Sequence, residues 1–306
     1  MVEQVIEANN VSKKYSDVTA LKNVNISIAR GDIYGLVGDN GAGKSTFLKL
    51  LTGQIFLTDG EIRLLGEHIP GNIEKQRRRT GAIIESPGFY PNLTVEKNLE
   101  YYRIQKGVPG KRIVEKTLDT VGLLDKKNKR CTDLSMGMKQ RLGLAVALLG
   151  EPEILILDEP INGLDPSGII EIRNLFLNLN REKRITIIIS SHMLRELQQI
   201  ASVYGFLSKG KLLKQISIEE LTEQCSSYVE ITTSNPEKYS SLLEKELGHS
   251  QYSVMPDKSI RIINPRIGVE QISNLASKHN ITITKLDKIQ VSLEDYYMNL
   301  KNGGNA

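Results

Sequence analysis

One eight-residue segment restricts the fold of this chain more than any other part of the sequence. Residues 38–45 read Gly-Asp-Asn-Gly-Ala-Gly-Lys-Ser and match the pattern G-x-x-x-x-G-K-[ST]. The β-branched run 33–37 before it predicts a strand, and the apolar spacing of residues 44–51 after it predicts a helix. A glycine-rich turn between a strand and a helix directs backbone N–H groups and the helix N-terminus at an anion. The segment therefore predicts an α/β fold with a phosphate site at this turn.

The loop residues have distinct expected roles in holding a nucleoside triphosphate. The glycines let backbone N–H groups converge on phosphate, Lys44 would neutralise the β- and γ-phosphates, and the Ser45 hydroxyl would ligate Mg²⁺. A glycine turn that only caps a helix would account for Gly43 but not for Lys44 and Ser45 together. The predicted binding residues of this loop are Gly38, Asp39, Asn40, Gly41, Ala42, Gly43, Lys44, Ser45 and Thr46.

A second acidic segment complements the loop. Residues 154–157 are four aliphatic side chains, and Asp158 and Glu159 follow them directly. Such a run predicts a buried strand of a parallel sheet, with both acids at its carboxyl end, where α/β sheets bind ligands. We expect Asp158 to hold Mg²⁺, directly or through water, and Glu159 to polarise an attacking water. The pattern is moderate evidence alone and strong evidence beside the phosphate loop.

Strand and helix patterns alternate through the first two thirds of the chain, which predicts an α/β sheet. The expected strands are 33–37, 81–85, 154–158 and 185–191. The expected helices are 44–51, 94–106, 111–121, 135–149 and 167–181. The tail differs in charge, because residues 215–306 hold 9 basic and 12 acidic side chains out of 40 and 36 in the whole chain. We therefore place a domain boundary near Gln215, with domains 1–214 and 215–306.

The tail shows a second order of elements. It reads as strand 228–233, helix 236–247, strands 252–255 and 259–263, helix 268–278, strand 282–288 and a last helix 293–301. This βαββαβ order predicts a small α+β domain of ferredoxin-like type. The tail carries no phosphate loop and no Cys/His cluster, so an interaction or regulatory module and a stabilising appendage without a ligand both remain open.

Composition excludes several classes of protein. The chain is 25% charged and 40% hydrophobic, an ordinary globular balance that excludes disordered and collagen-like proteins. Its longest apolar runs fall far short of the roughly 20 residues that span a bilayer. The acidic N-terminus does not resemble a secretory signal, and Cys131 and Cys225 lack C-x-x-C spacing. These features predict a cytoplasmic protein.

A further segment narrows the class. Residues 134–141 read Leu-Ser-Met-Gly-Met-Lys-Gln-Arg and open a predicted helix shortly before the Asp158 strand. The segment resembles the LSGGQ signature of ATP-binding cassette (ABC) proteins. The resemblance implies that Ser135 and Gly137 bind the γ-phosphate of an ATP held by a partner subunit. Anion binding at the start of a helix gives this role a physical basis.

Three other positions follow the order of the same family. Asn-Gly-Leu-Asp-Pro at 162–166 resembles the D-loop and includes Asp165, and His192 resembles the switch histidine. Tyr15 stands where the family stacks an aromatic ring on adenine. Each motif occurs once over residues 1 to about 214, so the chain is identified as similar to an ABC cassette of P-loop NTPase fold with ATP and Mg²⁺ as ligands. The catalytic residues that the resemblance implies are Lys44, Glu159 and His192.

The chain departs from the family pattern at two places. Glu85 stands where most members have glutamine; it can still bind Mg²⁺ or water, but its charge would alter coupling to the transporter. Met136 and Met138 replace a glycine and the glutamine of the signature, whereas Ser135 and Gly137 remain. We expect ATP binding and hydrolysis to survive these changes.

Residues 84–94, together with the signature segment, resemble the ATPases of bacitracin and lantibiotic exporters. The similarity concerns mainly a helical subdomain, about residues 86–150, which in the family touches the membrane subunits. It implies a head-to-tail homodimer with two ATPs between the copies, at the inner face of the cell membrane on a separate polytopic permease. No nucleic acid partner is expected.

Competing classes fit less well. The main alternative is an ABC-type ATPase that acts on ribosomes or DNA. The ribosomal type usually carries two cassettes, and the DNA type inserts a long coiled coil or zinc hooks, neither of which the sequence contains. A kinase or GTPase would share the phosphate loop without the signature, D-loop and switch histidine.

Overall fold

The chain forms two compact units, Met1–Ile218 and Glu219–Ala306, which are described separately below. The computed structural model describes residues 3–69, 73–85, 88–225, 228–263, 268–289 and 292–302. Ser86 and Pro87, which follow Glu85 in the exporter-like segment, lie outside these residues. None of the helices in the described ranges is both long and apolar enough to cross a membrane.

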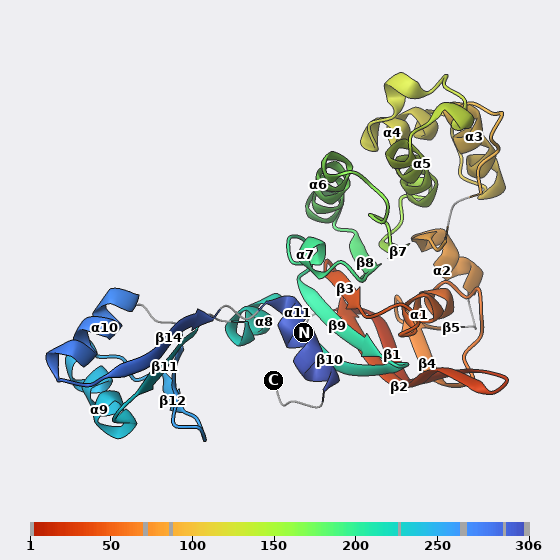
Figure 1. Cartoon of the computed structure of the whole chain (residues 1–306). Helices are drawn as coiled ribbons and strands as arrows, with labels where there is room; N and C mark the ends of the chain where they lie inside the picture. The colour runs from red at the N-terminus through yellow and green to blue at the C-terminus, as the bar shows by residue number, and fades with distance from the viewer. Residues whose placement is uncertain are drawn as a thin grey trace. The chain divides into compact units, whose positions relative to one another are not determined.

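A six-stranded sheet forms the centre of the first unit (Figure 1). Its order is β10-β9-β3-β8-β7-β6, and all neighbours are parallel except the antiparallel pair β9–β10. The strands are β3 (Ile33–Val37), β6 (Thr80–Ile83), β7 (Ile154–Asp158), β8 (Thr186–Ser191), β9 (Val203–Ser208) and β10 (Lys211–Ser217). The carboxyl ends of β3, β7 and β8 therefore meet at one edge of the sheet.

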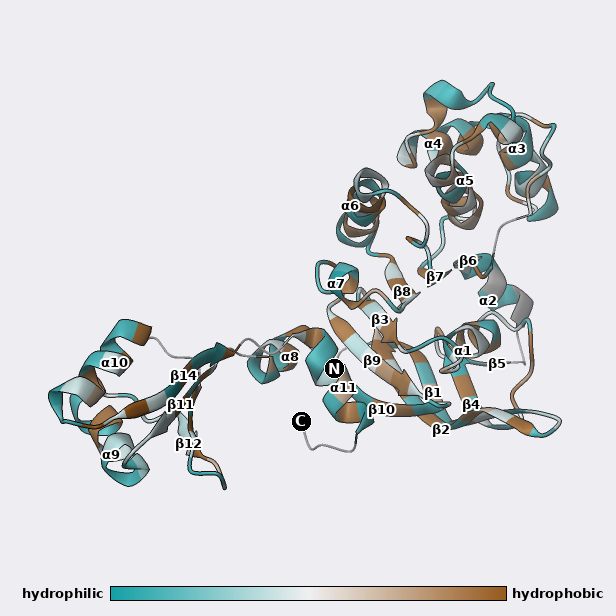
Figure 2. Ribbon diagram, viewed as in Figure 1, coloured by the Kyte–Doolittle hydropathy of each residue, from teal (hydrophilic) through white to brown (hydrophobic). Residues whose placement is uncertain are grey.

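Burial explains why these segments form strands. Every residue of β3 and β8 is buried, as expected for parallel strands covered on both faces. Figure 2 shows hydrophobic stretches along β3 and β9. β9, which the sequence did not predict, carries Gly205 against the ring of Tyr34. A Cβ on Gly205 would lie within 3.0 Å of that ring, so only glycine fits.

A second, antiparallel sheet lies beside the first and was not predicted. Its order is β2-β1-β4-β5, with β1 (Gln4–Tyr15), β2 (Val18–Ala29), β4 (Asp59–Leu64) and β5 (Glu67–Ile69). Helix α1 (Lys44–Leu51) shares one hydrophobic core with both sheets, because Phe47 and Leu48 cluster with Ile6 of β1 and Ile156 of β7. The phosphate-loop helix is thereby anchored from two sides.

The remaining helices of this unit are α2 (Ile73–Arg79), α3 (Val95–Gln105), α4 (Arg112–Thr120), α5 (Met136–Leu148), α6 (Pro166–Lys183) and α7 (Leu194–Leu197). Helices α3, α4 and α5 gather into a helical part of their own (Figure 1). Its centre holds the fully buried Asn98, whose amide donates to the carbonyls of Tyr90, Leu93 and Thr94 and to Cys131 Sγ. A buried side chain with that many partners ties the loop before α3 to the helix.

The second unit consists of α8 (Ile218–Gln224), β11 (Tyr228–Thr233), α9 (Pro236–Leu247), β12 (Tyr252–Val254), β13 (Ile260–Ile263), α10 (Val269–Lys278), β14 (Ile283–Ile289) and α11 (Leu293–Lys301). Its sheet has the order β12-β13-β11-β14, and every pair is antiparallel. Tyr239 and Leu243 of α9 and Ile272 of α10 form one core with Val229 and Ile231 of β11. Both helices therefore cover the face of the sheet that carries these valine and isoleucine side chains.

Candidate nucleotide-binding site

The phosphate loop lies between β3 and α1, and two of its glycines are required by their surroundings. A Cβ on Gly38 would lie 2.6 Å from the carbonyl oxygen of Leu207, and one on Gly43 would lie 2.8 Å from that of Ala20. Gly43 also has a φ of 108° and forms the N-cap of α1. Asp39, Asn40, Gly41 and Ser45 are exposed at this turn. The loop is held tightly at its two ends and presents its middle to solvent.

Lys44 is the buried cation of this loop. Its side chain is 5% exposed, and Nζ donates to the carbonyl oxygens of Gly38 at 2.7 Å and Asp39 at 3.3 Å. Nζ also lies 3.3 Å from Glu159 Oε1. The ammonium group is therefore fixed inside the curve of the loop, where it can face a phosphate.

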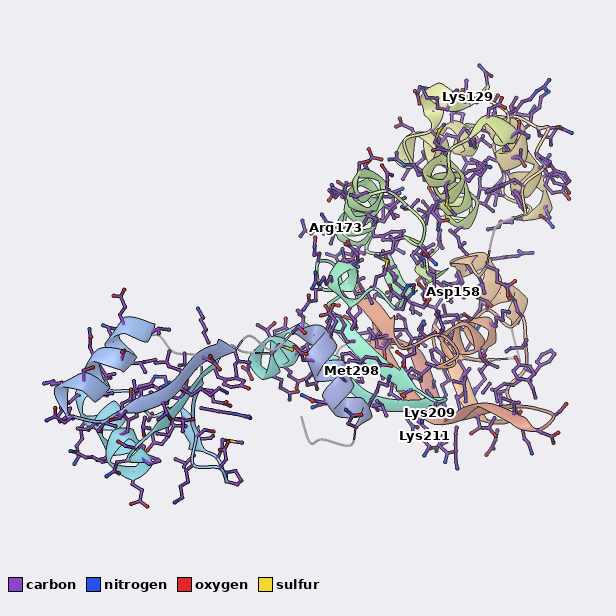
Figure 3. The ribbon with its side chains drawn as sticks, viewed as in Figure 1. Lys129, Asp158, Arg173, Lys209, Lys211 and Met298 are labelled. Carbon is purple, nitrogen blue, oxygen red and sulfur yellow. The ribbon has the colours of Figure 1, made fainter. Side chains whose placement is uncertain are left out.

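The two acids after β7 are positioned by the neighbouring strand β8. Asp158 pairs with Ser190 in the parallel register, and Figure 3 labels Asp158 at the carboxyl end of β7. Ser190 Oγ donates to Asp158 Oδ1 at 2.5 Å and accepts from the backbone N–H of Glu159 at 3.0 Å. Glu159 has a φ of 48°, which is a left-handed backbone conformation. The hydrogen bond from its backbone N–H to Ser190 helps to hold it in that conformation.

Glu159 joins the loop to the residue after β8. Its Oε1 faces Lys44, while its Oε2 lies 2.8 Å from Nδ1 of His192. At this distance the Glu159 carboxylate can accept a hydrogen bond from the imidazole ring. Three residues that are far apart in the sequence, Lys44, Glu159 and His192, thus form one connected polar group.

Glu85 has a partner that the sequence analysis missed. Its Oε1 lies 2.6 Å from Nζ of Lys49, in the last turn of α1. The hydrogen bond from Lys49 holds the pKa of Glu85 below its usual range, and the same bond, aided by the negative charges of Glu85 and Asp158, raises the pKa of Lys49. Lys49 stands four residues after Ser45, a helical spacing that could have drawn attention to it.

Tyr15 ends β1 and is 43% exposed, with Nζ of Lys13 4.8 Å from its ring centroid. A ring that is exposed on this scale can stack on a base without first leaving the core.

Ser135, Gly137 and Asp165 line a separate hollow of about 500 Å³. Ser135 caps α5 and accepts from the backbone N–H of Met138, while Asp165 caps α6 and accepts from that of Gly168. The Ser167 hydroxyl holds the pKa of Asp165 below its usual range. The walls of this hollow come from residues between 122 and 126, which follow α4, from the start of α5, from residues 163–165 and from the start of α6.

Signature and D-loop also touch each other within the chain. A Cβ on Gly163, whose φ is 76°, would lie 3.0 Å from both Sδ and Cε of Met136. Arg141 of α5 pairs with Glu171 of α6. These contacts hold the start of α5 against the loop that leads into α6.

The side chains near the loop suit a magnesium ion. Ser45, Asp158 and Glu85 offer hydroxyl and carboxylate oxygens, the ligands that Mg²⁺ prefers. No group of three or more His, Cys, Asp or Glu side chains that could hold a metal occurs among the described residues. Mg²⁺ is commonly bound by one or two carboxylates plus substrate phosphates, so this sparse oxygen set fits the ion.

A phosphate loop between β3 and α1, with acids at the ends of neighbouring parallel strands, defines a nucleoside triphosphatase of the P-loop class. The sequence profile of the ABC transporter family matches residues 21–162. The bacitracin transport ATP-binding protein BcrA of Enterococcus faecalis is 42% identical over 304 residues, which cover 99% of this chain and 98% of the relative. The chain therefore belongs to the ATP-binding proteins of ABC transporters, and it is an ATPase.

Other relatives and solved structures agree with this placement. The lantibiotic transport ATP-binding protein SrtF of Streptococcus pyogenes is 41% identical over 209 residues, 68% of this chain and 89% of the relative. The ATP-binding cassette MJ0796 was solved as a dimer in a post-hydrolysis state with ADP and Pi. It matches this chain with a TM-score of 0.63 and 26% identity, and the match covers 70% of this chain and 98% of the MJ0796 chain. CbiO1 from Clostridium perfringens, part of the ABC transporter complex cbiONQ, has a TM-score of 0.67 and 26% identity. This match covers 80% of this chain and 96% of the CbiO1 chain. The expected ABC cassette fold is confirmed.

Proposed function

We propose that this cassette hydrolyses ATP with Glu159 as the general base on the in-line water. Lys44 neutralises the β- and γ-phosphates, His192 holds the γ-phosphate or the water, and the Tyr15 ring stacks on adenine. The contact of Glu159 with both Lys44 and His192 carries this assignment, because it places a carboxylate between the phosphate cation and a second polar side chain. Ser45 and Asp158, with Glu85 beside them, hold Mg²⁺, which supplies charge neutralisation at the phosphates.

Two copies of the chain pair head to tail and enclose two ATPs. Each ATP contacts residues 38–46 of one copy and Ser135 and Gly137 of the other, with Asp165 at the contact between the copies. This arrangement is supported by the separation of the two groups within one chain, since Ser135, Gly137 and Asp165 open to a hollow of their own. The dimeric state of the similar cassette MJ0796 supports it as well.

A polytopic permease docks on the side of α2 and α3. A pocket of about 1000 Å³ lies there, with walls from the end of α1, from α2, from Tyr102 of α3 and from residues 106–109. The exposed side chains of Tyr101 and Ile104 lie on α3 beside it. A partly apolar hollow of this size can take a short helix of a membrane subunit.

The substrate is an antimicrobial peptide of bacitracin or lantibiotic type, which the transporter exports so that the cell resists it. The names of the relatives BcrA and SrtF support this choice, and BcrA matches the chain almost end to end. The cassette works in the cytoplasm, at the inner face of the membrane. The relatives favour this reading over an ATPase that acts on ribosomes or DNA.

Residues 215–306 form a ferredoxin-like accessory domain with an interaction or regulatory role. The βαββαβ element order and the all-antiparallel sheet support the fold. The full-length match to BcrA, which includes this part of the chain, supports a role shared with that relative.

The test is the Glu159→Gln variant, assayed for ATP binding, dimerisation and phosphate release. The amide keeps the shape but cannot accept the proton of water, so we expect ATP-dependent dimers without hydrolysis. Cells that carry the variant in place of the parent protein become as sensitive to bacitracin or a lantibiotic as cells without it. The control is Glu67→Gln, which changes an acid that pairs with Lys75 outside the site. It should leave both ATP hydrolysis and peptide resistance unchanged. Normal ATP turnover in Glu159→Gln would refute the role of Glu159 as general base. Unchanged sensitivity of the cells to both peptides would refute the proposed peptide substrate.

A further inference from the structure

Lys49 is a basic side chain of α1 that the mechanism above does not use. It stands four residues after Ser45, so both residues lie on the same face of the helix, one turn apart. The Lys49 side chain is 30% exposed, whereas that of Glu85 is 70% exposed. The cation is therefore partly enclosed at the phosphate-loop helix, and the acid reaches it from solvent.

Two predicted site groups act on this one ammonium. Glu85 accepts a hydrogen bond from it at 2.6 Å, and the negative charge of Asp158 interacts with it electrostatically. The two acids come from the residues after β6 and from the end of β7, which are separate segments of the unit. Both carboxylates that the sequence analysis assigns to the metal site therefore act on Lys49.

The charges explain what this position requires. A bound triphosphate, Asp158 and Glu85 are all negative, and an unpaired carboxylate beside a triphosphate would repel it. Lys44 already contacts the carbonyl of Gly38 inside the loop and the carboxylate of Glu159. Lys49, a second cation one turn after Ser45 on α1, compensates the negative charge of Glu85.

We propose that Lys49 is a positioning residue of the ATP site, which neutralises Glu85 and holds it against α1 beside the bound triphosphate. This inference rests on the proposed ATP site. It assigns the pair, rather than Glu85 alone, as the unit that tunes nucleotide affinity. Removing the cation alone leaves the Glu85 carboxylate without its counter-charge, whereas removing both charges takes that repulsion away.

The experiment measures the Kd for ATP in the presence of Mg²⁺ by calorimetry, with all variants built in full-length Glu159→Gln protein so that ATP persists. At low ionic strength we expect Lys49→Gln to weaken binding by about fivefold, a modest effect because the charge pair is partly exposed and screened by solvent. The double variant Lys49→Gln/Glu85→Gln binds ATP more tightly than Lys49→Gln, since the carboxylate that Lys49 neutralises is gone as well. Lys49→Arg keeps the charge and binds like the parent, and the loss in Lys49→Gln shrinks in high salt.

Lys75→Gln is the matched control, because Lys75 pairs with Glu67 on the surface and should leave ATP affinity unchanged. Thermal unfolding of each variant reports whether the substitution damaged the fold. Equal affinity in Lys49→Gln and its parent, or a double variant as weak as Lys49→Gln, would overturn the inference. If the Glu159→Gln parent itself binds no ATP, the proposed site fails first, and this outcome is distinct from a failure of Lys49.

Discussion

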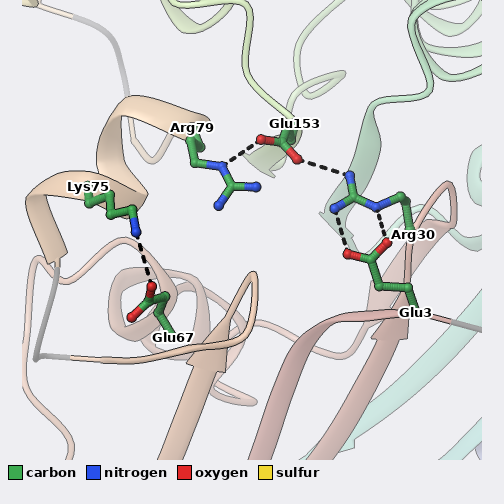
Figure 4. Close-up of polar contacts among 6 residues, drawn as sticks. All are labelled: Glu3, Arg30, Glu67, Lys75, Arg79 and Glu153. Carbon is green, nitrogen blue, oxygen red and sulfur yellow. Dashed lines mark hydrogen bonds and ion pairs between the residues drawn. The ribbon is translucent and has the colours of Figure 1, made fainter.

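A network of charges on the first unit allows a stability prediction to be worked out from its geometry. Glu153, which directly precedes β7, accepts from Arg79 Nε at 2.6 Å and from Arg30 Nη1 at 3.0 Å (Figure 4). Arg30 also forms two hydrogen bonds with Glu3, at 2.7 and 2.8 Å. Glu153 thus connects the turn between β2 and β3 with the end of α2, on the side of the sheet away from the candidate site.

The perturbation is Glu153→Gln, which removes two ion pairs and keeps the shape of the side chain. Arg30, Arg79 and Glu153 are 33%, 37% and 35% exposed, so each pair is screened by solvent and contributes less than about 1 kcal/mol. We expect a total loss of about 1.5 kcal/mol. For a unit of this size that loss lowers the thermal midpoint by about 3–6 °C.

The effect depends on pH in a defined direction. The hydrogen bond from Arg79, followed by that from Arg30, holds the pKa of Glu153 below its ordinary value. A carboxyl group with a lowered folded-state pKa contributes its stabilisation above the unfolded pKa and loses it as the pH falls through the folded one. The difference between the parent and Glu153→Gln should therefore be full at pH 7, begin to shrink as the pH reaches the ordinary carboxyl pKa, and disappear only once the pH is below the lowered folded-state pKa of Glu153.

The assay is thermal unfolding of the full chain at pH 7 and at a series of lower pH values, monitored by calorimetry or circular dichroism. Glu67→Gln is the control, because the Lys75–Glu67 pair in the same view is more exposed, at 65% and 36%, and should shift the midpoint by less than about 1 °C. ATP hydrolysis at 25 °C stays at the parent level, since the network lies away from residues 38–46. Equal midpoints for Glu153→Gln and Glu67→Gln at pH 7 would refute the reasoning.

Two further substitutions test packing in the two units. Asn98→Ala removes the amide that joins Tyr90 to Cys131 and leaves buried polar groups unpaired, so we expect a loss of about 2–3 kcal/mol and faster proteolysis of the helical part; parent-like proteolysis would contradict this. Tyr239→Phe removes the buried hydrogen bond from Oη to the carbonyl of Ile272, 2.7 Å long, and should destabilise the second unit by about 1 kcal/mol while ATP hydrolysis is retained. A calorimetric trace identical to that of the parent would contradict this second expectation.

Several elements were readable in the sequence because their signals are local. The loop 38–45, the buried strand β7 and the helix start at Ser135 depend on glycine, aliphatic and capping residues at fixed spacings. The helix expected from Ser167 begins slightly earlier, at Pro166 with Asp165 as its N-cap. The antiparallel sheet β2-β1-β4-β5 was missed. Its strands alternate only imperfectly between buried and exposed residues, and the register of β1 against β2 is interrupted by shifts. Such strands carry a weak period-two pattern and are defined mainly by their partners.

The sequence alone determined the class of this protein, since its motifs occur in one order and each motif is a short run of residues with its own chemistry. Only the tertiary structure decided which side chains meet. The parallel register of β7 and β8 brings Ser190 to Asp158 and Glu159, and the packing of α1 brings Lys49 to Glu85. Contacts between residues more than 30 positions apart depend on how strands and helices pack. The local sequence around one residue therefore does not identify the distant residue that it contacts.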